Sequence, residues 1–181
     1  MFFELIKKRR SQRRFRPEKI ETEKIKSLME AALRAPSSRG LNPWRFIVID
    51  DPDMPEKLSA SKPHGASFLK NAPLGIVVCA SEEESDVWVE DTSIASIFIH
   101  LAAEALDLGS CWIQIRKRAH NRDMSAETYI RNLLNIPETI KIESIMAIGY
   151  PDHVKPPHPK ASLQTEKVFF NRFDENSTTT V

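Results

Sequence analysis

The stretch from Val89 to Leu108, VEDTSIASIFIHLAAEALDL, decides how the rest of this chain can fold. It predicts the longest helix of the protein, with apolar residues on almost every side. They are Ile94, Ile97, Phe98, Leu101, Ala102, Ala105 and Leu106. A helix that is apolar all round is buried, either at the centre of a fold or by a second subunit. We expect Gly109, directly after it, to end the helix as its C′ residue.

On both sides of this stretch, segments of helical periodicity alternate with short apolar runs typical of strands. We expect a short first helix whose end is formed by residues 5–10, and further helices at 21–35, 53–61 and 125–134. We expect strands at 44–49, 74–80, 110–115 and 142–149. Residues 62–71 mix loop with a short helix, 82–86 form a surface loop, and 151–159, with four prolines, are extended. This alternation indicates one domain of helices around one sheet. We place it at residues 1–173 and expect a disordered tail at 174–181.

The composition is that of an ordinary soluble globular protein. The chain has 181 residues, of which 41% are hydrophobic and 28% charged, which suits one domain with a substantial core. A disordered, collagen-like or disulfide-built protein is excluded. The longest apolar stretch, residues 94–108, is too short and interrupted to span a bilayer, and charges begin too early for a signal peptide. We therefore expect a cytoplasmic protein with no membrane partner.

Positive charge is concentrated near the N-terminus. The net charge is only +1, but seven cations lie within residues 7–16, which leaves −6 for the rest of the chain. They are Lys7, Lys8, Arg9, Arg10, Arg13, Arg14 and Arg16. Such a segment forms a solvated helix end, a nucleic-acid-binding arm, or a phosphate clamp, because the planar guanidinium grips phosphate with two hydrogen bonds. No basic stripe with interleaved aromatic residues continues the segment, so we expect no nucleic-acid partner.

No set of side chains forms a recognisable catalyst. The five glycines are scattered and make neither a dinucleotide fingerprint nor a P-loop. The five histidines lack metal-ligand spacing, so we expect no metal. We interpret Cys79 and Cys111 as buried core residues, and His100 as a satisfied core or interface residue. If the protein is an enzyme, a bound cofactor therefore carries the chemistry.

Three short segments have the residue types of a shared ligand site. Residues 9–15, RRSQRRF, offer arginines and a hydroxyl to an anion. Residues 35–46, APSSRGLNPWRF, end a helix and present small hydrogen-bonding residues before a strand. Residues 149–160 begin with GYP and end with PPHPK, and this extended segment can carry basic groups back to the anion. Each pattern alone is common, but their order and spacing together are specific.

Taken together, these segments resemble the nitroreductase family of flavoenzymes. The family typically opens with Arg-(Arg/His)-Ser-x-(Arg/Lys)-x-Phe, as at residues 9–15, and continues with Pro-Ser-Ser-x-x-x-x-Pro-Trp, as at residues 36–44. A Leu-Gly-x-Cys-Trp-like strand and a closing Gly-Tyr-Pro correspond to residues 108–112 and 149–151. The resemblance spans residues 2–173.

That resemblance implies an α+β fold, a three-layer αβα sandwich with a mixed, mostly antiparallel sheet, in an interlocked homodimer with FMN at the subunit interface. The long apolar helix would lie in the dimer core. The residues implied for the FMN phosphate and ribityl chain are Arg9, Arg10, Ser11 and Arg13, with His158 and Lys160 as further basic contacts. The loop implied to reach the flavin of the partner subunit contains Pro36, Ser37, Ser38 and Gly40. The segment implied to lie against the flavin ring is Gln114, Ile115 and Arg116.

The activity that the resemblance implies is that of an FMN-dependent oxidoreductase. NADH or NADPH donates hydride to the flavin, which then reduces a nitroaromatic, a quinone or a related small acceptor in a ping-pong reaction. Three residues depart from the common family pattern: Gly40 replaces Asn, Asn42 replaces Gln, and His158 replaces Arg or Lys. They leave open a flavin-binding protein without nicotinamide turnover, which stores or senses flavin, removes halogens or breaks flavin down.

Overall fold

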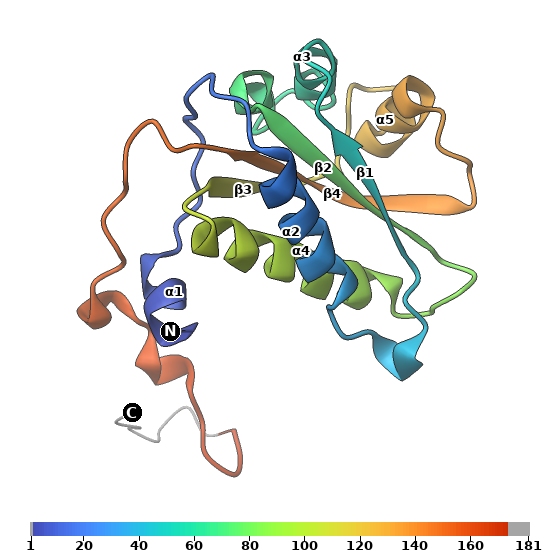
Figure 1. Ribbon diagram of the computed structural model, residues 1–181. Helices are drawn as coiled ribbons and strands as arrows, with labels where there is room; N and C mark the ends of the chain where they lie inside the picture. The colour runs from blue at the N-terminus through green and yellow to red at the C-terminus, as the bar shows by residue number, and fades with distance from the viewer. Residues whose placement is uncertain (1, 174–181) are drawn as a thin grey trace.

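A four-stranded sheet forms the middle layer of the computed structural model, which describes residues 2–173 (Figure 1). Its strands, in the spatial order β1-β2-β4-β3, are β1 (Trp44–Ile49), β2 (Leu74–Ser81), β4 (Ile140–Gly149) and β3 (Gly109–Gln114). Neighbouring strands are antiparallel throughout this sheet. The predicted strands and the mostly antiparallel sheet are confirmed. The predicted tail at 174–181 lies outside the described residues.

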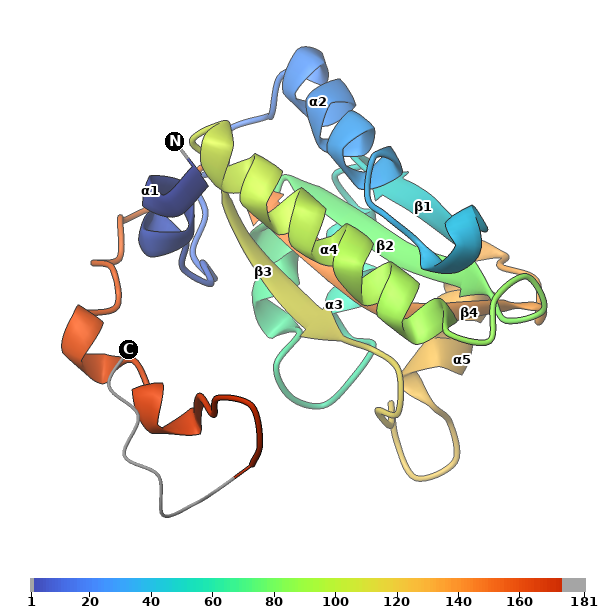
Figure 2. The ribbon, with the colours of Figure 1, turned by 90° about the horizontal axis from the view of Figure 1, so that it is seen from below.

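Helices cover both faces of the sheet, as the predicted three layers require. On one face lie α2 (Thr22–Leu33) and α4 (Trp88–Ala105), and on the other lie α3 (Met54–Ser59) and α5 (Ala126–Leu134). Figure 2 shows α4 running along the sheet with α2 beside it. The short α1 (Phe2–Lys8) contacts α4. Turns of 3-10 helix occupy Ser38–Gly40, Ser67–Asn71, Lys160–Ser162 and Thr165–Lys167.

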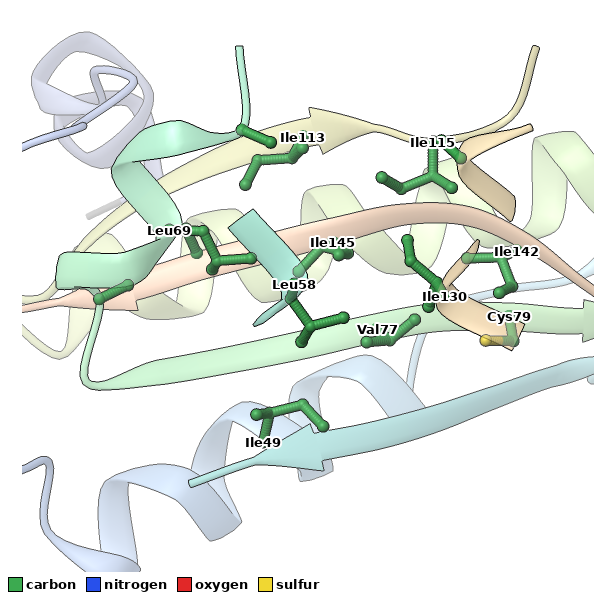
Figure 3. Close-up of a cluster of buried hydrophobic side chains, with 14 of the residues drawn as sticks. Ile49, Leu58, Leu69, Val77, Cys79, Ile113, Ile115, Ile130, Ile142 and Ile145 are labelled. Atoms are coloured by element: carbon green, nitrogen blue, oxygen red, sulfur yellow. The ribbon is translucent and has the colours of Figure 1, made fainter. Parts of the chain in front are cut away.

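β2 is buried along its whole length because it lies between two hydrophobic cores. Ile76 and Val78 pack towards α2 and α4, whereas Val77 and Cys79 pack towards α3 and α5. Successive side chains of a strand lie on opposite faces, so a strand covered on both sides reads as a continuous apolar run. Figure 3 shows the core on the α3 and α5 face, where isoleucines of β1, β3, β4 and α5 gather around Leu58 of α3.

β4 breaks this alternation at Glu143. Residues 78 and 79 of β2 pair with Ser144 and Ile142, so Glu143 is an extra residue without a partner in β2. Such a β-bulge allows Ile142 and Ile145 to face the same core although they are three positions apart. Glu143 is 4% exposed, so the bulge places a carboxyl group inside the protein.

The long apolar helix ends three residues earlier than predicted, and Gly109 does not end it. α4 stops at Ala105, and Asp107 adopts the left-handed conformation, with φ of 58°. The prediction that Gly109 is the C′ residue is therefore wrong. Gly109 begins β3, where a Cβ atom would lie 2.8 Å from side-chain atoms of Gln12. Glycine is needed there because another segment approaches closely, not because the helix turns.

Beyond Asp152 the chain leaves the body of the fold. Residues 154–173 lie apart from the sheet in both views (Figures 1 and 2). Residues 154–159 contain neither helix nor strand, in agreement with the extended segment expected from the prolines. The segment exposes large apolar side chains: Val154, Leu163, Val168, Phe170 and Phe173. Isolated apolar residues are common on protein surfaces, but a series of them on a projecting segment is typical of a contact with another chain.

Candidate functional site

The candidate site begins with an extended arm, residues 10–16, that follows α1 and crosses the ends of β3 and β4. The arm is held by backbone hydrogen bonds to both strand ends. Gln12 N donates to Ser110 O, and Arg16 N donates to Tyr150 O, each at 2.9 Å. Because the arm is extended, successive side chains point in opposite directions. Gln12 is buried while Arg13 is exposed.

Two glycines allow the arm to approach the sheet this closely. A Cβ atom on Gly149 would lie 2.6 Å from Pro73 and 3.0 Å from Phe15, and one on Gly109 would meet Gln12. Both glycines belong to motifs that carry the family resemblance, Gly-Tyr-Pro and Leu-Gly-Ser-Cys-Trp. In this structure those motifs position the arm.

Four cations and a hydroxyl group gather where the arm meets β3, and we call them the basic cluster: Arg9, Arg10, Arg13, Lys155 and the Ser11 side chain. Lys155 Nζ donates to the carbonyl oxygen of Ser11 at 2.7 Å. Arg10 Nη1 donates to the carbonyl oxygen of Pro156. The proline-rich segment therefore returns to the arm, as the sequence predicts.

The cation that the proline-rich segment delivers is Lys155, which the sequence analysis missed. His158 and Lys160, the predicted basic contacts, are exposed and make no side-chain hydrogen bond or ion pair within residues 2–173. Lys155, His158 and Lys160 lie within six residues of one another in an extended segment, so spacing alone does not single out one of them. The contact is decided by where the segment crosses the arm.

Cys111 of β3 shows that the remaining members of the cluster lie together. Burial raises the pKa of its thiol, while the charges of Arg13 and Lys155 and a hydrogen bond with Ser11 act in the opposite direction. Cys111 is thus a buried, protonated thiol with the cluster around it, as its interpretation as a core residue requires. Burial also raises the pKa of Cys79, to about 12.

Among residues 2–173 the basic cluster has no acidic partners, unlike its neighbours in the sequence. Three other cations of the segment are paired with carboxylates: Lys7 with Glu4 at 2.7 Å, Arg16 with Glu18 at 3.1 Å, and Arg14 with Asp152 at 3.7 Å. Within residues 2–173, no carboxylate oxygen lies within 4.0 Å of a cationic nitrogen of the cluster. The cluster therefore creates a positive potential that an anion such as a phosphate would neutralise.

A further cation, Lys62, lies at the other end of β3. Its Nζ donates to the carbonyl oxygen of Gln114 at 2.9 Å. Burial and the nearby charge of Arg118 lower the pKa of Lys62. Ser110 and Gln114 are four residues apart, about 13 Å along a strand. The sequence analysis left residues 62–71 without a role, because a contact to a backbone carbonyl has no sequence pattern.

The Gln114 side chain is fixed at both ends of its amide group. Trp112 Nε1 donates to Gln114 Oε1 at 2.9 Å, and Gln114 Nε2 donates to Glu143 Oε1 at 3.0 Å. Glu143 Oε2 is buried and accepts no hydrogen bond from residues 2–173. Burial raises the pKa of Glu143, while the Gln114 hydrogen bond and the charge of Arg116 lower it. Glu143 is a second residue that the sequence analysis missed, since only the β-bulge turns it towards Gln114.

The other two residues predicted beside a flavin ring have different environments. Ile115 is fully buried among the apolar residues of the α3–α5 core, which leaves only its backbone for a ligand. Its N–H donates to the carbonyl oxygen of Glu143 at 3.0 Å. Arg116 is half-buried, with its guanidinium 5.6 Å from the centre of the Trp88 ring and its Nε 3.9 Å from Glu143 Oε2.

The predicted partner-facing loop lies at the opposite end of α4 from the basic cluster. Ser38 N donates to Oδ1 of Asp91, in the first turn of α4, at 2.8 Å. Arg9 instead contacts His100, nine residues further along the helix. Nine residues of helix span about 14 Å. Within one chain, the loop and the cluster are therefore not brought together.

The polar groups of this loop are largely satisfied by one another. Ser37 Oγ donates to Asn42 Oδ1 at 2.8 Å and accepts from Asn42 N at 2.9 Å. Arg39 forms an ion pair with Asp86. Gly40 has a φ of 68°, and the loop leaves Pro36 and Gly40 exposed. The loop is thus a rigid projection whose backbone remains accessible.

A cleft of about 780 Å³ lies on the other side of the arm. It is bordered by the arm, the β1–α3 turn and the segment before β2, and its lining includes Arg14, Lys19, Asp50 and Lys70. Of the predicted site residues it contains only Arg13.

Two other kinds of site are not found in residues 2–173. No group of three or more His, Cys, Asp or Glu side chains there is placed to hold a metal ion. None of the helices formed by these residues has the length and apolar character needed to cross a membrane. Along β3, the basic cluster at one end can bind an anion. At the other end, backbone groups, the Gln114 amide and the Lys62 ammonium group can form hydrogen bonds.

Comparison with known proteins agrees with the fold and the motifs. The model of the nitroreductase family matches residues 6–62 and 51–150. An FMN-dependent nitroreductase of Clostridium difficile R20291 is 46% identical, with a TM-score of 0.92 over 93% of this chain and 98% of that one. A candidate NADH dehydrogenase/NAD(P)H nitroreductase of Archaeoglobus fulgidus is 39% identical over 155 residues, 83% of this chain and 86% of the relative. An iodotyrosine deiodinase of Thermotoga neapolitana is 28% identical over 184 residues, 88% and 94% of the two chains.

Proposed function

The chain belongs to the nitroreductase family, and on that premise we propose that it is an FMN-dependent NAD(P)H oxidoreductase that reduces a nitroaromatic, a quinone or a related small acceptor. The basic cluster carries this proposal. Four cations without carboxylate partners in residues 2–173, beside the Ser11 hydroxyl, favour a ligand that ends in a phosphate. The name of the 46% identical Clostridium difficile relative supports FMN as that ligand.

The residues at the two ends of β3 suit the two ends of FMN, its phosphate and its ring. Arg9, Arg10, Arg13 and Lys155 would neutralise the dianionic phosphate, and Ser11 would donate its hydroxyl. Lys62 and the Gln114 segment, about 13 Å away along β3, would make polar contacts with the ring. When bound, FMN supplies the hydride chemistry, which we propose runs as a ping-pong exchange between NADH or NADPH and the acceptor.

In this reaction the protein's own residues would bind and orient the flavin. Trp112 and Glu143 together fix which end of the Gln114 amide donates and which accepts. Lys62 is held against β3 and has a lowered pKa. Contacts of fixed polarity near a flavin ring tune its reduction potential. We therefore assign tuning to Gln114 and Lys62, and phosphate binding to the basic cluster.

We infer that two copies form a homodimer around α4 and that each flavin site uses both. The middle of α4 exposes Ile94, Ile97 and Phe98, with 38%, 48% and 37% of their surface accessible. Contiguous apolar surface of this kind is typical of subunit interfaces. Asp91 lies three residues before this patch and His100 two residues after it, so a two-fold axis there would place the loop of one chain beside the basic cluster of the other. Pro36, Ser37, Ser38 and Gly40 would then contact the partner's flavin, and His158 and Lys160 remain predicted phosphate contacts.

The dimer is tested by placing a charge on this patch. We expect Phe98→Glu to convert a dimer to a monomer in sedimentation velocity and to release FMN, because the site loses one wall. Leu33→Glu is the control, since Leu33 is also exposed but belongs to α2 and not to α4. A Phe98→Glu protein that remains dimeric and retains FMN would contradict this arrangement.

The activity is tested by a visible absorption spectrum of the purified protein, repeated without oxygen after NADH and then NADPH. We expect flavin bands that bleach with one or both nucleotides and return when a nitroaromatic or a quinone is added. If no flavin bands appear even after reconstitution with FMN, the proposed function is wrong.

Reductive removal of a halogen is a second candidate, supported by the 28% identity with an iodotyrosine deiodinase over 88% of this chain. It predicts a flavin that NADH and NADPH leave oxidised but that dithionite reduces. The reduced protein would then consume iodotyrosine, with flavin bands returning as iodide is released. Bleaching by a nicotinamide nucleotide, with no reaction towards iodotyrosine, would favour the first proposal.

A further inference from the structure

His100 connects α4 to the basic cluster. The side chain is 6% exposed, and its two ring nitrogens contact two different segments. Its Nε2 is 2.8 Å from Nη1 of Arg9, and its Nδ1 is hydrogen-bonded to Oγ of Ser110. Ser110 is the residue whose carbonyl oxygen accepts the Gln12 N–H, so the same ring contacts a cluster cation and the strand to which the arm is attached.

These contacts determine the tautomer of the ring. The guanidinium of Arg9 can only donate hydrogen bonds, so Nε2 of His100 must accept. The proton of the neutral ring therefore lies on Nδ1 and is donated to Ser110 Oγ. Burial, together with the charge of Arg9, lowers the pKa of His100 to about 4, which agrees with a neutral ring at physiological pH.

A neutral acceptor orients a guanidinium without cancelling its charge. Arg14 and Arg16, in the same segment, are held by carboxylates, which neutralise them. Arg9 is held by an imidazole and keeps its full positive charge. A cation that is both fixed and uncompensated is what a phosphate site requires, because the ligand neither displaces an acid nor orders a mobile side chain.

The other charged groups near this contact do not take the place of His100. Glu104, one turn further along α4, has a pKa raised by burial, and the charges of Lys8 and Arg9 lower it in part. Within residues 2–173, Glu104 forms no ion pair within 4.0 Å of Arg9. Lys8 is exposed and, being a cation, cannot accept a hydrogen bond from Arg9.

We propose that His100 is a positioning residue for FMN: as a neutral acceptor it fixes the Arg9 guanidinium at the phosphate end of the site and ties it to the start of β3 through Ser110. The inference rests on the proposed function, because it requires a phosphate at the basic cluster. It adds a residue of α4 that lies between that cluster and the dimer patch. In its assigned role this residue has no contact with the ligand.

Substituting His100 by Gln or by Asn tests its contact with Arg9 and its contact with Ser110 separately. The oxygen of Gln reaches the position of Nε2 and accepts from Arg9, whereas the amide of the shorter Asn reaches only the position of Nδ1, beside Ser110. We expect His100→Asn to weaken FMN binding roughly 10-fold, within the range of a lost hydrogen bond to a charged group, and His100→Gln to remain within about threefold of wild type. FMN affinity is measured by flavin fluorescence titration of the reconstituted protein.

A double-mutant cycle with Arg9→Ala identifies the path of the effect. If His100 acts through Arg9, His100→Asn causes no further loss of FMN affinity once Arg9 is alanine. An equal loss in both backgrounds overturns the proposal, and so does an unchanged affinity in His100→Asn. Wild-type protein that binds no FMN would instead show that the proposed function is wrong, so the two failures are distinguishable.

Imidazole nitrogen NMR on the wild-type protein tests the contact even if His100→Asn does not fold. We expect the Nδ1-protonated neutral tautomer, with the Nε2 resonance shifted when Arg9 is replaced by alanine. A ring protonated on Nε2 could not accept from Arg9, and that result would overturn the proposal.

Discussion

The charged groups near the two ends of α4 differ in their partners. At its N-terminal end, Asp91 is buried and its carboxylate accepts hydrogen bonds from Ser38 N and Ser85 Oγ, each at 2.8 Å. At the other end, Arg9 is held by a neutral histidine, and the cations around it have no carboxylate partner in the part of the chain that the structure describes. The first end is complete within one chain, while the second has positive charge that no carboxylate of residues 2–173 neutralises.

The helix dipole explains the sign of charge at each end but not this difference. Glu90 and Asp91 lie in the first turn of α4, where negative charge is favourable, and Arg9 lies near its C-terminal part, where positive charge is favourable. What differs is the partner. The carboxylate of Asp91 holds a loop in place, whereas the guanidinium groups near the other end remain available to an anion. The difference teaches that uncompensated charge, more than charge itself, marks the candidate site.

The largest effect should come from removing that uncompensated charge. We expect the double variant Arg10→Ala/Arg13→Ala to lose about 3–6 kcal/mol of FMN binding free energy, since each lost hydrogen bond from a charged group contributes about 1.5–3 kcal/mol. The matched control is Arg14→Ala/Arg16→Ala, which removes the same charge from carboxylate-paired residues and should weaken binding less than about tenfold. Equal losses in a fluorescence titration would show that net charge, not the cluster, attracts the flavin.

A change in pH should sharpen the comparison at the His100 end. The folded pKa of His100 is lowered to about 4 from 6.5, so the unfolded chain binds the proton more tightly between these values. The stabilising contribution is complete above pH 6.5 and is lost as the pH falls towards 4, on the order of 3 kcal/mol in all. We expect the difference in free energy of unfolding between wild type and His100→Gln, measured in urea, to change with pH in this sense. A difference that is constant from pH 4 to 7 would contradict it.

The smallest effect concerns the satisfied end of α4. Asp91→Ala leaves the Ser38 N–H and the Ser85 hydroxyl without their acceptor and should lower the free energy of unfolding by about 2 kcal/mol. Arg39→Ala removes an exposed ion pair with Asp86 in the same loop and should cost less than about 1 kcal/mol. Chemical denaturation measures both. A loss as large for Arg39→Ala as for Asp91→Ala would mean that the exposed pair, not the buried carboxylate, holds the loop.

Most elements of the fold could be predicted because their signals are local. The apolar run of residues 74–80 predicts a strand covered on both faces, and β2 is buried at every position. The helices α2 and α5 follow from their periodicity. The end of α4 was mispredicted because glycine is the usual helix-ending residue, while the close approach of Gln12 to Gly109 depends on a segment nearly a hundred residues away.

The candidate site also contains residues that local sequence predicts and residues that only tertiary contacts bring together. Residues 9–13 are adjacent in sequence, so their residue types alone indicate an anion site. Lys155 and Lys62 join the site through contacts with backbone carbonyls, which leave no pattern in the sequence. Glu143 joins it because one extra residue in β4 reverses the alternation of the strand, and a bulge is visible only once the register of both neighbours is known.

The sequence by itself determined the elements, the family and the basic arm, because periodicity, helix ends and clustered charge act between residues close together in the chain. Only the tertiary structure decided which cations lack an acid, which lysine completes the cluster, and that a buried histidine holds Arg9. Each of these depends on how deeply a side chain is buried and which group it contacts, and both are decided by segments far apart in the sequence. The same residue types in another packing would form ordinary surface ion pairs.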